Sequence, residues 1–515
     1  MRKNIKIFVI AVLALAVTTA ARAQFSGSGT QADPYLVSTA ADLTTLATKV
    51  NNGTGYSGEY FKQTADINMS GIAWAAIGTN QNPFYGNYDG NHKTISNLTC
   101  SASSGSFGGL FGKVGNQNNT ESRTLKNIRL VNCTISSSSN AAGIVATSTN
   151  CNIECCEVMG SISGSSSVGG IAGEMTGGSI EGCFASGTVS ASGYSSSKGM
   201  ILGSTTSAPT CSGNTYISTN SVGAGTSSVA NLGTAQPTSG TLSSKISWTL
   251  GGTYHTELTI TATNNTGGMP WDYSTTTIAG IARTTAPWGW HFSELTVDDG
   301  VTIIKNNAFA GNPNLNTVTL PASVYIIGSN AFAGNHNLEI VTLPASGFNI
   351  GSGAFADCIS LQRVIIQYLS AVPLGANNVF DGCTALQYID FPNLSAALAN
   401  TTGNWSGYAD KVRALFCGQY FHVTTNGDTY AISTEEDLRN LAAVVNGGND
   451  CEGETFRQTA DIDLSSGGDF PMIGKYIGTY FKGTYDGGNR TISGLVVNNN
   501  SIKTPDSFVL SNTER

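Results

Sequence analysis

Charged side chains are scarce in this 515-residue chain, because only 11% of its residues are Asp, Glu, Lys or Arg. A typical soluble domain has roughly 25%. Its 33 acidic residues outnumber its 25 basic residues, which gives a formal net charge of −8. A mildly acidic chain with few charges is a poor partner for nucleic acid or for an anionic membrane surface. We therefore predict that it binds neither.

Histidine and the sequence motifs of common enzymes are also missing or rare. The chain has five His, and each is isolated, so none has an evident metal or nucleophile partner. We find no G-x-S-x-G, H-E-x-x-H or P-loop motif. The sequence thus offers no catalytic, cofactor-binding or metal-binding residues, and we predict no enzymatic activity and no cofactor.

Long apolar runs are absent after the first two dozen residues. Residues 7–17 are apolar, follow a basic segment at 2–6, and precede an A-x-A site that ends at Ala23. This run is too short to span a bilayer and is typical of a secretory signal peptide. We predict a signal peptide at 1–23 with cleavage after Ala23, and hence a secreted or cell-surface protein. No later stretch of about 18 apolar residues occurs, so we predict no membrane span.

What the chain has instead is repetition. The segment 61–67 recurs almost unchanged as 456–462, and 308–312 recurs at 331–335 and 354–358, a period of 23 residues. A fixed period of this size indicates a solenoid, in which each repeat buries its apolar face only against its neighbours. Glycine is abundant, at 62 residues, which is typical of turn-rich β structure. The fold class we predict is mainly β, with tandem solenoids and short capping helices.

Two segments, 24–99 and 428–515, are copies of a cap followed by strands. Each opens with a helix signal, Thr39 with Asp42 and Thr434 with Asp437, in which the threonine is the N-cap and the acid lies three residues later. A helix ahead of a stack of strands would cover the open end of the stack. The second copy ends at Arg515 before further rungs follow, so we expect a truncated or frameshifted record, the alternative being a module with an unprotected edge.

Residues 100–217 carry Gly-aliphatic segments at 109–112, 143–145, 170–173 and 199–201, with spacings of 34, 27 and 29 residues. Each is followed by a short strand, such as 128–133 or 179–183. This spacing predicts one rung of a parallel β-helix per repeat, with glycines at tight corners. The repeats resemble the GLUG motif of surface and secreted bacterial proteins, and 167–173 with 180–187 is the best match.

Residues 295–394 form a second array. Its repeats keep an aromatic position in step at Phe309, Phe332, Phe355 and Phe380, a leucine position at Leu315, Leu338, Leu361 and Leu386, and short strands that often end in proline. Alternate apolar residues of each strand should point inward. This array resembles the BspA-type leucine-rich repeat of bacterial surface proteins. Residues 246–294 resemble the segment that often introduces this repeat.

The remaining segments, 218–245 and 395–427, are predicted to be linkers, the first because it is rich in Ser, Thr, Gly and Ala. Trp288 and Trp290 could form a sugar-stacking platform, but packing in the core at the entrance of the array is favoured.

Cysteine and aspartate positions invite metal-binding hypotheses. Five of the 11 Cys take like places in successive repeats, and Cys358 and Cys383 share theirs with Asn312 and Asn335. We expect a small buried residue that faces the backbone of the turn, and so buried free thiols, although a disulfide stays open. The group at 151–156 lacks a nearby His, which disfavours zinc. Five Asp in turns are expected to cap backbone N–H groups, with calcium as the alternative, at Asp66, Asp89, Asp461, Asp463 and Asp486.

The resemblances imply a bacterial adhesion protein that presents extended solenoid faces to a host extracellular protein or glycan. Candidate surfaces are the strand face of the leucine-rich array and the loop near Pro373; the ligand-binding residues and the oligomeric state stay unknown. A structural spacer of the envelope or matrix is the alternative. A glycan-active enzyme is least favoured, because residues 100–217 contain no Asp, His or Trp and such a groove needs carboxylates, alone or with Lys or Arg, converging on neighbouring rungs.

Overall fold

A computed structural model describes residues 25–497, except for short gaps at 104, 116–117, 119–120, 194–196, 221, 227–228, 263–266, 279, 370–371, 373–377, 401–402, 425–428, 467 and 475–479. The predicted signal peptide, the loop at Pro373 and the last residues of the second cap lie outside the described residues. The chain is mainly β, a solenoid of about 16 turns with few short helices, so the predicted fold class is confirmed.

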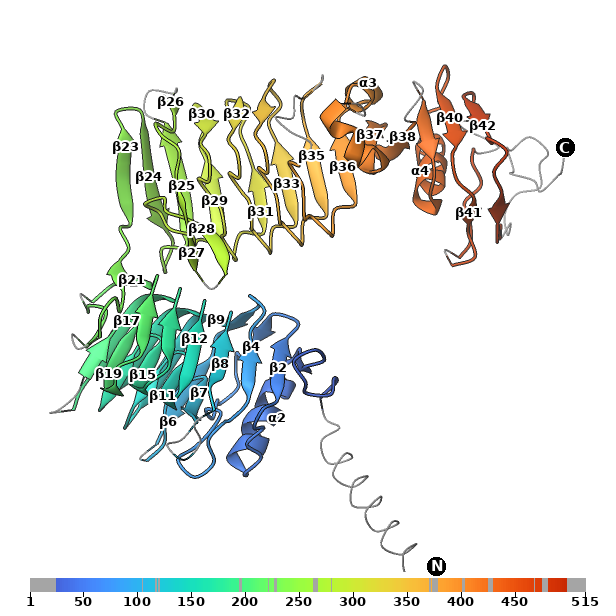
Figure 1. Ribbon diagram of the computed structural model, residues 1–515. Coiled ribbons are helices and arrows are strands. Elements are labelled where there is room, and N and C mark those ends of the chain that lie inside the picture. Colours follow the sequence, from blue (N-terminus) through green and yellow to red (C-terminus); the bar gives the residue numbers. More distant parts are fainter. Residues whose placement is uncertain are drawn as a thin grey trace, which may run out of the picture. The chain divides into compact units, whose positions relative to one another are not determined.

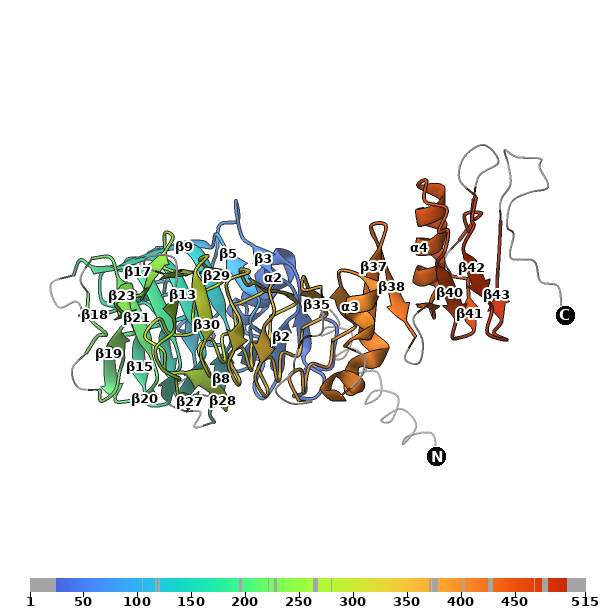
Figure 2. The same cartoon turned by 90° about the horizontal axis from the view of Figure 1, so that it is seen from above.

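The chain divides into two compact units. The first comprises Met1–Thr238, Gly251–Thr256 and Thr277–Ile281, and the second comprises Ser239–Leu250, Glu257–Thr276 and Ala282–Arg515. Within each unit the strands are stacked side by side along the solenoid (Figures 1 and 2).

The first unit is a parallel β-helix whose strands form four sheets. The seven-stranded sheet consists of β1 (Tyr35–Val37), β2 (Tyr60–Gln63), β4 (Asn87–Asp89), β8 (Arg123–Lys126), β12 (Cys151–Glu154), β16 (Ser179–Glu181) and β20 (Thr210–Ser212). The eight-stranded sheet consists of β22 (Thr234–Ala235), β21 (Thr215–Ser218), β17 (Phe184–Ala191), β13 (Glu157–Gly164), β9 (Arg129–Ser137), β5 (Thr94–Ser96) and β3 (Ile67–Asn68), with β6 (Thr99–Ala102) beside β9. The smaller sheets are β19 (Leu202–Ser207), β15 (Ala172–Thr176), β11 (Val145–Thr149) and β7 (Phe111–Val114), and β10 (Ala141–Ala142), β14 (Ser167–Gly169) and β18 (Ser197–Gly199).

Glycine allows the rungs of this β-helix to approach closely. A Cβ added to Gly170 would lie 2.0 Å from the backbone oxygen of Met200 on the next rung. A Cβ on Gly178, whose φ is +83°, would lie 2.1 Å from the backbone oxygen of Cys151. Any side chain at these positions would push neighbouring rungs apart.

The second unit begins with strands that lead into the leucine-rich array. One sheet consists of β23 (Ser239–Ser243), β24 (Ile246–Gly251), β25 (Glu257–Ala262) and β29 (Glu294–Val297), and another of β26 (Gly267–Gly268), β30 (Val301–Ile304), β32 (Ile326–Ile327) and β34 (Asn349–Ile350). A nine-stranded sheet follows the order β31 (Thr317–Thr319), β33 (Ile340–Leu343), β35 (Arg363–Ile366), β36 (Tyr388–Phe391), β37 (Val412–Phe416), β38 (Gln419–Val423), β39 (Tyr430–Ile432), β40 (Thr455–Gln458) and β42 (Thr484–Asp486). Two-stranded sheets are formed by β27 (Thr275–Ile278) with β28 (Ile281–Thr284) and by β41 (Ile462–Asp463) with β43 (Ile492–Ser493).

The core of the array is a ladder of in-step side chains. Phe309, Phe332 and Phe355 are fully buried, and consecutive rings lie 5.2 Å apart, with interplanar angles of 28° and 3°. The leucine position is equally buried, with exposed fractions between 0% and 5% at Leu315, Leu338, Leu361 and Leu386. The predicted inward-facing positions are therefore confirmed.

Both predicted helices are present and have the predicted capping. The helices among the described residues are α2 (Ala40–Asn51), α3 (Leu394–Leu398), α4 (Glu435–Asn446) and the 3-10 helix η2 (Gly403–Lys411). In α2 the Asp42 backbone N–H donates to the Thr39 hydroxyl oxygen at 3.1 Å, and the Thr39 backbone N–H donates to the Asp42 carboxylate at 3.0 Å. Thr434 and Asp437 repeat this capping box in α4.

Asp437 has more partners than Asp42 because a strand of the preceding hairpin packs beside α4. The Nδ1 atom of His422, in β38, lies 3.0 Å from a carboxylate oxygen of Asp437. Burial alone raises the pKa of Asp437, but hydrogen bonds from His422, Ser433 and Thr434 outweigh burial and leave the pKa below its usual range.

The two segments expected to be linkers are structured. Residues 395–427 contain most of α3, η2 and the strands β37 and β38. Strand β36 pairs in parallel with β37, and β38 pairs antiparallel with both β37 and β39, so the sheet of the array continues into the second cap. In 218–245, Val222, Val229 and Leu232 belong to the core of the first unit. A few apolar residues in a polar segment were too weak a pattern to predict this burial.

Candidate binding groove

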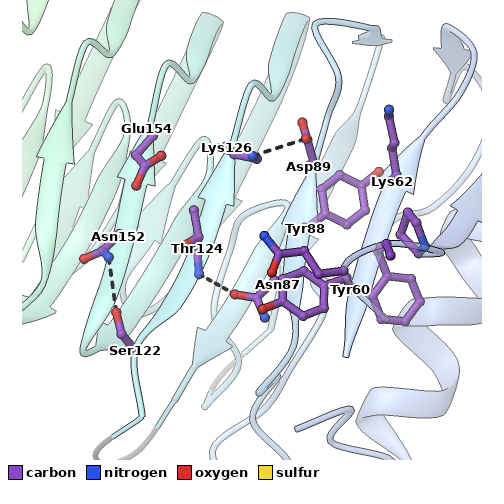
Figure 3. A pocket seen from close by; sticks show the side chains of 14 residues that line it. Tyr60, Lys62, Asn87, Tyr88, Asp89, Ser122, Thr124, Lys126, Asn152 and Glu154 are labelled. Atoms are coloured by element: carbon purple, nitrogen blue, oxygen red, sulfur yellow. Dashed lines mark hydrogen bonds and ion pairs between the residues drawn. The ribbon is translucent and has the colours of Figure 1, made fainter. Parts of the chain in front are cut away.

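An open groove with a volume of about 590 Å³ lies on the outer face of the seven-stranded sheet in the first unit. Strands β2, β4, β8 and β12 form its floor (Figure 3), and Gln31, Ala32 and Pro34, which precede the edge strand β1, also line it. The alternation of the strands decides which side chains face the groove. Phe61, Tyr88, Leu125 and Ile153 are buried in the core, so their neighbours on each strand point outward.

The parallel register aligns these outward residues in two columns across the rungs. The first column contains Tyr60, Asn87, Thr124, Asn152 and, one rung further, Ser179. The Thr124 backbone N–H donates to Asn87 Oδ1 at 2.9 Å, and Ser179 Oγ donates to Asn152 Oδ1 at 3.0 Å. Every member is neutral, and the column offers hydroxyl groups, amides and one aromatic ring.

The second column is charged, and its first four members alternate in sign. It contains Lys62, Asp89, Lys126 and Glu154, and continues to Glu181 on the next rung. Lys126 Nζ lies 3.5 Å from Asp89 Oδ2, as the dashed line in Figure 3 marks. Partial burial raises the pKa of Glu154, Lys126 opposes that shift, and the nearby carboxylates Glu181 and Asp89 add to it.

The charges that line the groove balance. Two lysines, Lys62 and Lys126, face two carboxylates, Asp89 and Glu154. Asp89 is also held by the backbone N–H of Asn91 at 2.8 Å and by Asn127 Nδ2 at 2.9 Å. The groove therefore has little net charge and a fixed arrangement of polar groups.

The aspartates that the sequence places in turns do cap backbone N–H groups. The other four capping bonds, beside that of Asp89, measure 2.7–2.9 Å and join Thr94 N to Asp66, Thr491 N to Asp461, Ser465 N to Asp463, and Gly488 N to Asp486. Among the described residues, no group of three or more His, Cys, Asp or Glu is placed to hold a metal ion.

The two tryptophans at the entrance of the array pack in the core, as favoured. Trp288 is 1% exposed, and its Nε1 donates to the backbone oxygen of Ala308 at 3.1 Å. The guanidinium of buried Arg283 lies 3.8 Å from the ring centre of Trp290. Neither ring can offer a sugar-stacking platform.

The shared Cys and Asn position faces the backbone, as predicted. Asn312 Nδ2 donates to the backbone oxygen of Phe292 at 2.7 Å, and Cys358 Sγ and Cys383 Sγ make the equivalent contacts to Phe332 and Phe355 at 3.2 and 3.0 Å. Burial raises the pKa of the Cys133 and Cys151 thiols to about 12, so both stay protonated. The prediction of buried thiols is wrong for Cys417, which is exposed on the β37–β38 turn, and Cys211 and Cys383 are only partly buried.

The strand face of the leucine-rich array is another candidate surface. At its C-terminal end, charged side chains pair with one another. Asp390 is fully buried and accepts from Arg413 Nε at 2.7 Å and from Arg363 Nε. The Arg413 guanidinium lies 3.5 Å from the ring centre of Tyr388, whose hydroxyl donates to Glu436 at 3.1 Å. This network joins the array to α4.

Comparisons with known proteins agree with the array. Residues 289–402 match the model of the BspA type leucine rich repeat region in six copies. The chain therefore carries a BspA-type leucine-rich repeat region, as the resemblance implied. No helix among the described residues is long and apolar enough to cross a membrane.

Two curated proteins share part of the sequence. Halomucin of Haloquadratum walsbyi is 31% identical over 147 residues, which is 27% of this chain and 2% of Halomucin. A candidate Gly-rich membrane protein of Evansella cellulosilytica is 34% identical over 116 residues, which is 21% of this chain and 13% of that protein. The matched regions thus span only a small part of the length of these relatives.

Two solved structures are also similar. A Bacteroides ovatus protein described as a candidate immunoglobulin A1 protease is 23% identical, over 41% of this chain and 75% of that one, with a TM-score of 0.29. A leucine rich cell surface protein from Faecalibacterium prausnitzii is 12% identical, over 68% of this chain and 86% of that one, with a TM-score of 0.21.

Proposed function

We propose that this protein is exported and acts at the cell surface as a non-enzymatic binding protein, with the groove of the first unit as its binding site. The observation that carries the proposal is the pair of outward columns, which place polar groups at regular intervals on a rigid sheet. The BspA-type array and the apolar, signal-like segment at 7–17 support an exported surface protein. A host glycan or extracellular protein is the expected partner class.

The groove favours binding over the role of a structural spacer. A spacer needs only buried rungs and a solvated surface. Here Gln31, Ala32 and Pro34 line, together with Tyr60, a groove of about 590 Å³, and binding sites are concave with a few convergent polar groups.

Glycan cleavage is the alternative that the same face must be tested for. The structure brings Asp89, Lys126 and Glu154 together on neighbouring rungs, the convergence that residues 100–217 could not supply alone, because Asp89 comes from the cap. Asp89 is held by Lys126, Asn91 and Asn127, which favours a positioning role over proton transfer. Partial burial raises the pKa of Glu154, which is the direction that a general acid needs.

The test is a binding panel of host matrix proteins and polysaccharides against residues 24–515. We expect at least one ligand to bind the unaltered chain and to lose affinity with the double variant Tyr60→Ala and Asn152→Ala. The matched control is Thr455→Ala, which alters the position in the second cap that corresponds to Tyr60. If every ligand binds the double variant and the unaltered chain with equal affinity, the role of a structural spacer is favoured. Release of reducing ends from a polysaccharide, lost in Glu154→Gln, would favour the enzyme.

A further inference from the structure

We infer that the ligand of the groove is a neutral glycan chain that lies across neighbouring rungs of the first unit, with a sugar ring stacked on Tyr60. This inference rests on the proposed function and adds the chemical class of the ligand. Three observations carry it: the cancelled charge of the groove, the free hydroxyl groups that face it, and a comparison with the second copy of the cap.

The charges of the groove are arranged so that no net field selects an ionic ligand. Two lysines and two carboxylates line it, and they alternate along the column. Each of these four charges lies one strand spacing, about 4.8 Å, from a charge of opposite sign. This separation is shorter than the Debye length, so salt screens the attraction only partly. An acidic polysaccharide or a basic peptide would gain attraction at one rung and meet repulsion at the next.

The polar groups that remain free suit hydroxyl groups of a ligand. Tyr60 and Thr124 point into the groove (Figure 3), and neither side chain makes a hydrogen bond with another described residue. Both are hydroxyls, which donate and accept. Asn87 and Asn152 lie in the same column, between and beyond them.

Tyr60 supplies the apolar part of the site. It lines the groove together with Ala32 and Pro34, which are also apolar. Its side chain is half-buried, so one part of the ring stays open. An aromatic ring with a polar tip beside apolar neighbours can pack against the C–H face of a sugar while its hydroxyl binds a sugar oxygen.

The second cap separates the structural part of this face from the binding part. There Arg457 and Asp486 pair at 3.2 Å, in the places of Lys62 and Asp89. The positions of Tyr60 and Asn87 are taken by Thr455 and Thr484. The two copies thus share the charged column, so the fold alone accounts for these charges. The aromatic ring of Tyr60 and the amide of Asn87 therefore have no counterpart at these positions of the second copy.

The experiment compares ligands of different charge on the full chain without its predicted signal peptide. The probes are a neutral polysaccharide set, the same set with uronic acid or sulfate groups, and matrix proteins, each at low and high salt. We expect a neutral polysaccharide to bind with an affinity that salt changes by less than about twofold. Tyr60→Ala should weaken it roughly tenfold, Tyr60→Phe less, and Thr455→Ala not at all.

A second pair of variants tests the role of charge. The double variant Lys62→Met and Glu154→Gln removes one charge of each sign and keeps the groove neutral, so its affinity for the neutral polysaccharide should stay as insensitive to salt as that of the unaltered chain. Preferential binding of a charged glycan or a protein through the groove, with a steep salt dependence, would overturn the inference and leave the proposed function intact. If the groove variants change the binding of no ligand, both this inference and the proposed function fail.

Discussion

Replacing Phe332 by Ala should loosen the leucine-rich array locally and strongly. Its ring is fully buried and lies 5.2 Å from each of the rings of Phe309 and Phe355. Removal of a buried Phe side chain costs about 3–5 kcal/mol, from lost burial and from the cavity that remains. Phe332→Leu keeps most of the burial and loses both ring contacts, each worth about 0.5–1.5 kcal/mol, so it should cost about 1–3 kcal/mol.

Native-state hydrogen exchange is the suitable assay, because a chain of two units does not unfold in one two-state step. In a solenoid each rung is stabilised by its neighbours, so amides of the rungs at 309–355 should open more readily in Phe332→Ala. At about 1.4 kcal/mol for each factor of ten, the opening equilibrium should rise by a factor on the order of 10² to 10³.

The control is Leu369→Ala, in the same array, where the side chain is 64% exposed. It should change exchange very little. The account of a locally stacked core would be refuted by equal exchange in the Phe332→Ala and Leu369→Ala variants. It would also be refuted by protection lost equally in the first unit.

Three further changes test other parts of the structure. Asp390→Ala leaves the buried Arg413 and the partly exposed Arg363 without their shared carboxylate, so it should cost about 3–5 kcal/mol, seen as faster exchange in β36 and β37. The pKa of Asp437 lies below its ordinary value of 3.8, so its carboxylate stabilises the second cap at neutral pH; protection of α4 should fall as pH drops through the folded-state pKa, and Asp437→Asn should abolish that dependence. Gly170→Ala should cost about 1–3 kcal/mol by overpacking, measured by native-state hydrogen exchange in the neighbouring rungs, whereas Gly223→Ala, with no atom closer than 4.0 Å to the new Cβ, should cost far less.

Local patterns in the sequence were enough to predict the caps and the array. Thr39 with Asp42, and Thr434 with Asp437, form their capping boxes from residues three apart, so neighbours in sequence determine the contact. The phenylalanine ladder follows from a period that repeats in phase. In both cases each repeat supplies the same information again.

The groove could not be predicted, because its residues meet only through the register of strands that are far apart in the sequence. Tyr60, Asn87, Thr124 and Asn152 are each an ordinary polar residue beside a buried one. Their alignment depends on loops of different length between rungs. The signal that could have found them is the alternation in Tyr60–Gln63 and in Asn87–Asp89, once the strands are set side by side.

The β37–β38 hairpin makes the array and the second cap one continuous hydrogen-bonded surface. Strand β38 is the sole reversed strand of the nine, so the strands on both sides of the hairpin run in the same direction. Cleavage of the chain anywhere in 395–427 would leave an unpaired strand edge on both fragments. Unpaired strand edges promote association between copies. Fragments prepared for study should therefore keep the hairpin joined to both of its neighbours.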